Sequence, residues 1–154
     1  SLLSKVDQLK LWDSLDLIDV ISTDHAPHTL EEKYDQMSPK FGVPGLETAL
    51  PLMLSAVDKG FLTLKRVTTM MSANPKKIFN LPSQPNTHVE VDLSQRYKIS
   101  NKGLFTKCAW TPFEGMQAGG RVVKVVIRSK TVFENNVFKG DPSGKVIYPV
   151  PKIG

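Results

Sequence analysis

Residues 17–28 read LIDVISTDHAPH, and this stretch decides the fold class. Its first half is short, apolar and rich in β-branched side chains, which is typical of a buried strand in a parallel sheet. Pro27 has no N–H to give to a sheet ladder, so we expect the chain to leave the sheet there. The sequence therefore predicts a buried strand over residues 17–23, which ends at Asp24 and is followed by a polar loop.

The segments around this predicted strand have helical spacing. Apolar residues recur loosely over residues 2–17 and more regularly over residues 46–57, where Lys59-Gly60 supplies a stop. Thr63 is placed to cap a further helix that runs to about Ser72. Asn74-Pro75 is expected to break that helix before a last short one, which ends near Asn80. A strand among helices makes this part of the chain α/β.

The second part of the sequence has a different character, because apolar and polar residues alternate there. Such alternation is typical of half-buried strands, and the pair Asn135-Asn136 is typical of a hairpin turn. We place the boundary near residues 82–86 and expect two domains, 1–85 and 86–154. Strands are predicted at residues 88–93, 97–99, 122–127 and in a hairpin over 131–138.

Length and charge exclude several classes of protein. The chain has 154 residues and a net charge of +5, which is too short for a complete (β/α)₈ barrel of about 250 residues. The basic excess lies in residues 86–154, spaced among apolar residues, and so favours solvated strand faces over a nucleic-acid site. A single cysteine, Cys108, indicates a reducing compartment. Without an apolar run of ~20 residues or a signal-peptide pattern, we expect a cytoplasmic protein with no membrane contact.

The chemistry of the sequence is concentrated in residues 24–28, where Asp24, His25 and His28 follow the predicted strand. Ligands bind at the carboxyl ends of parallel strands, and a carboxylate there suits a metal ion or general base catalysis. The same residues could instead form an ordinary turn, with Asp24 as a cap and both histidines on the surface. Spacing alone leaves both interpretations open. Cys108 is better explained as a core residue than as a nucleophile.

Several motifs, in the same order along the chain, resemble the dihydroorotases of the amidohydrolase superfamily. Residues 21–29, ISTDHAPHT, with Glu31-Glu32-Lys33, are similar to the signature of that family. Three later segments are also similar to segments of that family: residues 43–52, Ser72-x-Asn74-Pro75 with Ile78-Phe79, and residues 110–115. The similarity extends to the dihydroorotase domain of multifunctional pyrimidine-biosynthesis proteins.

The resemblance implies a distorted (β/α)₈ barrel with an added β-domain built from both chain ends. Residues 17–24 would be the last barrel strand, and residues 1–85 the C-terminal portion of the barrel. Residues 86–154 would be the C-terminal part of the β-domain. The upstream portion of the barrel would then be a necessary partner of this chain.

The resemblance also implies an activity, the zinc-dependent, reversible cyclisation of N-carbamoyl-L-aspartate to L-dihydroorotate in de novo pyrimidine synthesis. Asp24 would be a zinc ligand and the proton shuttle, and His28 would hold the substrate. Phe41 would contact dihydroorotate, although its loop is one residue longer here than in the family pattern.

The family's binuclear zinc site uses further ligands that the sequence does not contain, among them an early His-x-His pair. We therefore expect the chain to be inactive by itself, and the resemblance implies homo-oligomers and fusion to carbamoyl-phosphate synthetase and aspartate transcarbamylase. Two alternatives stay open. The parent domain could be a catalytically inactive dihydroorotase-like scaffold, or a related cyclic amidase of the hydantoinase or allantoinase type.

Overall fold

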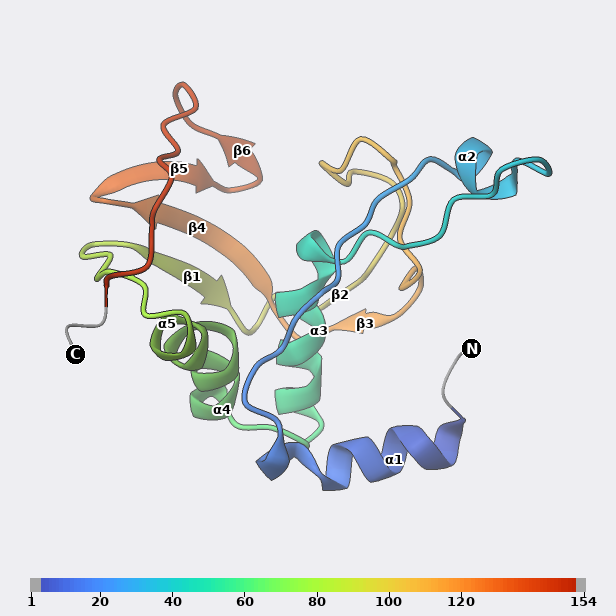
Figure 1. Cartoon of the computed structure of the whole chain (residues 1–154), viewed down its shortest axis with the longest axis horizontal. Helices are drawn as coiled ribbons and strands as arrows, with labels where there is room; N and C mark the ends of the chain where they lie inside the picture. Colours follow the sequence, from blue (N-terminus) through green and yellow to red (C-terminus); the bar gives the residue numbers. More distant parts are fainter. Residues whose placement is uncertain (1–3, 152–154) are drawn as a thin grey trace.

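The computed structural model describes residues 4–151, which form an α/β fold with helices first and strands after them (Figure 1). Ser4 caps the first helix by accepting a hydrogen bond from the Asp7 N–H. The helical part contains α1 (Lys5–Asp13), the single turn η1 (Leu15–Leu17), α2 (Leu30–Tyr34), α3 (Leu46–Asp58), α4 (Leu64–Thr68), η2 (Thr69–Ala73) and α5 (Asn74–Ile78).

Helix α3 is the centre of the fold, and it confirms the helix predicted over residues 46–57. It buries the side chains of Thr48, Pro51, Leu54 and Ala56. Gly60 ends it with a positive φ of 77°, and its N–H donates to the carbonyl of Val57 at 3.0 Å. This is the glycine stop that the sequence predicts.

The helix that begins after Thr63 is capped as predicted, because the Arg66 N–H donates to Thr63 Oγ1 at 3.1 Å. The predicted break at Asn74-Pro75 is wrong. The π-helical turn η2 joins α4 to α5, and the chain stays helical through Pro75. A π turn leaves one carbonyl outside the α-helical ladder, so the proline removes no hydrogen bond that the helix needs. Met70, fully buried, anchors this turn.

The strand predicted over residues 17–24 is also wrong as a strand. After η1 the segment is open, and its first bridge is the isolated parallel pair His25–Val43. A strand needs a neighbour to complete its hydrogen bonds. Among residues 4–151 the neighbour of this segment is a helix, since the Ile21 N–H donates to the carbonyl of Met70 at 3.3 Å. The segment is therefore tethered rather than paired.

The strands of the second part confirm the alternating pattern. The antiparallel sheet has the order β1-β4-β5-β6, and the turn between β5 and β6 is made by Asn135 and Asn136, both at positive φ. A two-residue strand, β3, was not predicted, because so short a segment shows no alternation. The strands are β1 (His88–Asp92), β2 (Tyr97–Lys98), β3 (Gln117–Ala118), β4 (Arg121–Ile127), β5 (Lys130–Glu134) and β6 (Val137–Phe138).

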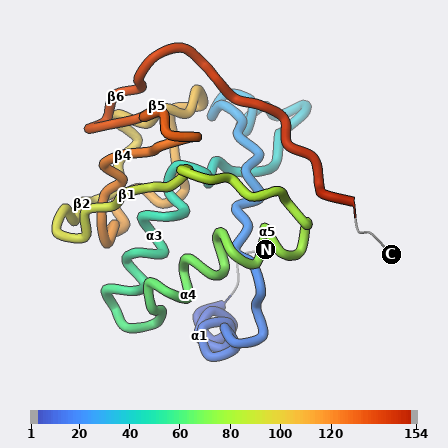
Figure 2. The backbone as a smooth tube through the Cα atoms, turned by 90° about the vertical axis from the view of Figure 1, so that its left-hand side faces the viewer, coloured from blue at the N-terminus to red at the C-terminus, as the bar shows by residue number. Residues whose placement is uncertain are grey.

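The two parts of the chain meet at α3. A Cβ added to Gly119 would lie 2.3 Å from the backbone of Leu54, so only glycine permits this approach. The Gly119 N–H donates to the carbonyl of Pro51 at 3.1 Å. Figure 2 shows the C-terminal segment running back from the sheet to α5, where the Val150 N–H donates to the carbonyl of Asn80 at 2.8 Å. No helix within residues 4–151 is long and apolar enough to cross a membrane.

Candidate functional site

Asp24 stands at the end of the tethered segment, which helices α4 and α5 hold through side chains. Arg66 Nη2 donates to the carbonyls of Leu15 at 2.6 Å and Ile18 at 2.8 Å. Asn74 Nδ2 donates to the carbonyl of Asp19 at 2.8 Å. Hydrogen bonds from a charged guanidinium are stronger than neutral ones, so Arg66 is the principal anchor. These contacts fix the path of the backbone that leads to Asp24.

Asp24 itself is exposed and has a positive φ of 45°, a conformation that is uncommon for residues other than glycine. The chain turns there, and a strained backbone in a turn is frequent at functional sites. Within residues 4–151 no group of three His, Cys, Asp or Glu side chains could hold a metal ion. The structure therefore places Asp24 as an accessible carboxylate and not as part of a complete metal cluster.

His25 caps the N-terminus of α3 through its imidazole ring. Its Nδ1 accepts hydrogen bonds from the N–H groups of Gly45 at 3.0 Å and Leu46 at 3.3 Å. The Ala26 N–H donates to the carbonyl of Val43 at 3.1 Å and reinforces the His25–Val43 bridge. These contacts join the two ends of the loop that runs from Asp24 to Gly45.

His28 lies on that loop with about a third of its side chain exposed. Its Nδ1 is 3.3 Å from Glu32 Oε2, which also accepts a hydrogen bond from the Thr29 N–H at 2.9 Å. The hydrogen bond from the Thr29 N–H lowers the pKa of the Glu32 carboxyl; desolvation opposes this, and His28 and Lys40 add to the lowering. Glu32 pairs with Nδ1, and within residues 4–151 no hydrogen bond engages the Nε2 of His28.

Phe41 is 82% exposed on the returning side of the same loop. Next to it, Gly42 has a φ of 100°, and a Cβ there would lie 2.7 Å from Ala26. The loop thus brings Asp24, His28 and Phe41 onto one element, with its returning side pressed against its outgoing side. Within the described residues no hydrogen bond or ion pair joins these three side chains.

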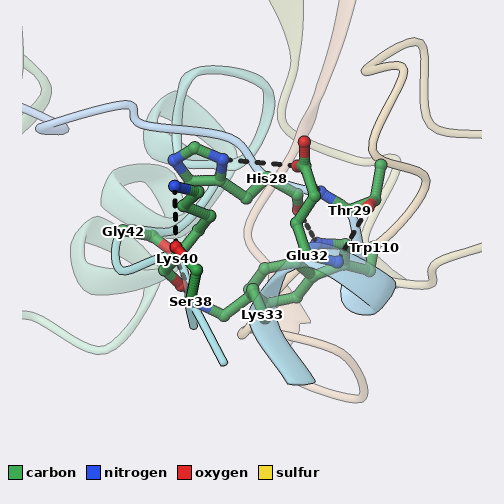
Figure 3. A network of polar contacts seen from close by, with 8 residues as sticks. All are labelled: His28, Thr29, Glu32, Lys33, Ser38, Lys40, Gly42 and Trp110. Atoms are coloured by element: carbon green, nitrogen blue, oxygen red, sulfur yellow. Dashed lines mark hydrogen bonds and ion pairs between the residues drawn. The ribbon is translucent and has the colours of Figure 1, made fainter. Parts of the chain in front are cut away.

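Two residues that sequence reasoning did not assign to the site support this loop. Lys33 and Trp110 join it to itself and to the second part of the chain (Figure 3). Lys33 belongs to the motif that resembles the dihydroorotase signature, and Trp110 is a core residue with 8% exposure. Neither its burial nor any spacing in the sequence indicates its hydrogen bond to the loop.

Comparison with known proteins gives the relationship. No family model matches the chain. It is 54% identical over 123 residues to the multifunctional protein pyr1-3 of Dictyostelium discoideum, which covers 80% of this chain. It is 39% identical over 150 residues, 94% of this chain, to the dihydroorotase of Pyrococcus furiosus. The resemblance to dihydroorotases is confirmed. The chain spans 6% of the first relative and 36% of the second.

Solved structures agree with this relationship. The inactive dihydroorotase-like domain of the CAD-like multifunctional protein of Chaetomium thermophilum matches with a TM-score of 0.70 and 32% identity, over 92% of this chain and 40% of that one. The L-hydantoinase of Arthrobacter aurescens matches with a TM-score of 0.82 and 29% identity, over 90% of this chain and 34% of that one. The chain thus shares the α/β fold of dihydroorotase-like domains and hydantoinases over most of its length.

Proposed function

We propose that this chain is the C-terminal portion of a dihydroorotase, which interconverts N-carbamoyl-L-aspartate and L-dihydroorotate in pyrimidine biosynthesis. One observation carries the proposal. The chain aligns over 94% of its length with an archaeal dihydroorotase and spans only 36% of it. The exposed Asp24 and His28 on one loop supply side chains that such a reaction can use.

In this proposal, residues 1–85 are the C-terminal portion of a (β/α)₈ barrel and residues 86–154 belong to a β-domain. The tethered segment over residues 17–24 would become the last barrel strand when a neighbouring strand pairs with it. Exposed apolar side chains favour this, because a separate soluble domain rarely leaves so many large ones uncovered. Those with more than three quarters of their surface exposed are Leu17, Tyr34, Met37, Phe41, Val146 and Tyr148.

The zinc that dihydroorotases and hydantoinases generally use fits this chain only in part. Asp24 offers one exposed carboxylate, a donor that zinc accepts, but residues 4–151 contain no cluster of three ligands. Asp24 would be one ligand of a binuclear site, and upstream residues would supply the others. Bound zinc would act there as a Lewis acid that polarises the amide carbonyl of the substrate.

In this proposal Asp24, His28 and Phe41 have separate roles in the reaction. In the hydrolytic direction Asp24 takes a proton from the attacking water and delivers it to the ring nitrogen as that nitrogen leaves. In the biosynthetic direction Asp24 takes the proton from the carbamoyl nitrogen as it attacks the side-chain carboxyl carbon, and delivers that proton to the oxygen that leaves as water. His28 holds the substrate through Nε2, the ring nitrogen that is not paired with Glu32. Phe41, exposed beside the loop backbone, covers the bound ring.

The test compares three proteins: the chain alone, the chain joined to its upstream portion, and the joined protein with Asp24→Asn. We expect the unaltered joined protein to turn over dihydroorotate and the other two proteins not to do so. Turnover by the 154 residues alone would contradict the dependence on upstream residues. Full activity of Asp24→Asn would contradict the role of the carboxylate.

Two other functions have specific support. The matched domain of Chaetomium thermophilum is inactive, so a joined protein with no activity on any cyclic amide would favour a scaffold role. The hydantoinase match, at a TM-score of 0.82, favours a related cyclic amidase if hydantoin or allantoin is turned over in place of dihydroorotate. The names of the multifunctional relatives also support fusion to carbamoyl-phosphate synthetase and aspartate transcarbamylase. We further propose that the whole protein is a cytoplasmic homo-oligomer.

A further inference from the structure

Trp110 reaches from the second part of the chain into the loop that carries His28. Its Nε1–H donates to the backbone carbonyl of His28 at 2.7 Å, although the two residues are 82 positions apart (Figure 3). The indole is 8% exposed, so water competes little for this hydrogen bond. The contact fixes the backbone of His28 and does not engage its imidazole, which pairs with Glu32 through Nδ1.

Lys33 makes the second connection. Its ammonium donates to the carbonyl of Gly42 at 2.7 Å and to that of Lys40 at 3.3 Å. The same ammonium lies 5.4 Å from the centroid of the Trp110 ring, within the range of a cation–π interaction. One partly buried charge therefore joins α2, the returning side of the loop and the indole.

These contacts hold the two sides of the loop that carries His28 and Phe41. Trp110 holds the backbone at His28, Lys33 holds the carbonyls on both sides of Phe41, and the two supporting side chains touch each other. Gly42 cannot shift inwards, because even a Cβ there would lie 2.7 Å from Ala26. The separation of His28 from Phe41 is thus set by the Lys33–Trp110 pair.

The backbone before the indole is itself held in an unusual state. Ala109 has a φ of 55°, a left-handed conformation that strains a residue with a side chain. Its N–H donates to the carbonyl of Thr106 at 3.0 Å, and the Thr106 N–H in turn donates to Glu47 Oε2 at 3.2 Å on α3. Strain persists where the surroundings over-determine the conformation. Helix α3 therefore fixes the loop that presents Trp110.

We propose that Lys33 and Trp110 are positioning residues for substrate binding, which hold His28 and the Phe41 backbone at the separation that the substrate requires. The proposal rests on the proposed function for the identity of the substrate. Neither residue touches the reacting atoms. Their loss should weaken substrate binding and leave the chemical step at Asp24 nearly intact.

A purely structural role would give a different kinetic result. A variant that only lowers the fraction of folded enzyme lowers the apparent kcat and leaves KM unchanged. A variant that misplaces a binding group raises KM and leaves kcat unchanged. The split between KM and kcat therefore separates the two roles.

The test uses the whole protein that contains this chain, with Trp110→Phe and Lys33→Met. We expect KM for dihydroorotate to rise about tenfold in each, as for the loss of a buried or charge-assisted hydrogen bond, with kcat within about twofold. Lys33→Arg keeps the charge and the donors and should restore most of the affinity. An unchanged KM in both variants would overturn the proposal.

Matched controls carry the same chemical changes elsewhere. Trp12→Phe alters a tryptophan that stacks on Phe61 at 5.2 Å, on the far side of the fold, and Lys139→Met removes an exposed lysine of the sheet. Both should leave KM unchanged. A rise in KM in the controls equal to that in Trp110→Phe and Lys33→Met would also overturn the proposal.

A second measurement does not depend on activity. The exposed Lys40 is a trypsin site on the held loop, and its rate of cleavage reports how often the loop opens. We expect cleavage after Lys40 to quicken about threefold or more in Trp110→Phe and Lys33→Met, and not in the controls. If the unaltered protein lacks dihydroorotase activity, the proposed function fails. Unchanged cleavage in Trp110→Phe and Lys33→Met would then separately refute the positioning role.

Discussion

Asp24 and His28 are four residues apart, yet different parts of the molecule hold them. The segment that leads to Asp24 is anchored by Arg66 and Asn74, from the helices of residues 1–85. The backbone of His28 is anchored by Trp110, from residues 86–154. The donors that hold the two residues are therefore different, although α3 also fixes the loop that presents Trp110, and each donor can be removed separately.

The largest effect is expected at Asp24. Asp24→Asn keeps the shape of the side chain but cannot carry a proton between water and the leaving nitrogen. We expect kcat for dihydroorotate to fall by about 10³-fold or more, with an unchanged melting temperature. Steady-state kinetics and thermal unfolding of the whole protein check this. Asp19→Asn is the control, because only the Asp19 carbonyl is engaged.

A smaller effect is expected at His28. His28→Ala removes the imidazole proposed to hold the substrate, and we expect KM to rise by about 10- to 100-fold, with a modest loss of kcat. His88→Ala is the matched control, since His88 lies on β1 and pairs with Glu90 at 3.2 Å, away from the loop. Equal kinetics for His28→Ala and the unaltered protein would remove His28 from the site.

A substitution of Arg66 tests how the segment that leads to Asp24 is anchored. Arg66→Met leaves the carbonyls of Leu15 and Ile18 without their charged donor, and we expect a loss of about 2 kcal/mol in the free energy of unfolding. Because Asp24 is then less well directed, kcat should fall about tenfold while KM is kept. Denaturant unfolding and kinetics give the two values. Lys65→Met, on the exposed side of α4, should change neither.

Glu32 is expected to give the smallest effect. Glu32→Ala removes the partner of His28 Nδ1 and half of a capping box with Thr29, so KM should rise about threefold. The pKa of the Glu32 carboxyl is lowered in the folded state, so its contribution is complete above its ordinary value of 4.5. That contribution is lost as the pH falls through the lowered pKa. Glu31→Ala, in the same turn, is the control.

The parts of the fold that the sequence predicts well are those with a periodic signal. Helix α3 and the strands β1 and β4 have clear spacing, and the Asn135-Asn136 turn has a known chemistry. The prediction for residues 17–24 failed because an apolar run does not show which element lies beside it. The prediction at Pro75 failed because a π turn accommodates a proline that an α-helix would not.

The candidate site was likewise predicted only where the sequence carries a recognisable pattern. The motif of residues 21–29 indicated Asp24 and His28, and the structure places both on an accessible loop. Arg66, Lys33 and Trp110 were not assigned there, because each acts on a backbone carbonyl far away in the sequence. A backbone carbonyl is present at every residue, so such a contact leaves no pattern of residue types to find.

The separate support of the two residues is tested most directly by the kinetics of one pair of variants in the whole protein. Arg66→Met should lower kcat for dihydroorotate and keep KM, whereas Trp110→Phe should raise KM and keep kcat. If both variants change the same parameter to the same extent, then Asp24 and His28 share one support and the account is wrong.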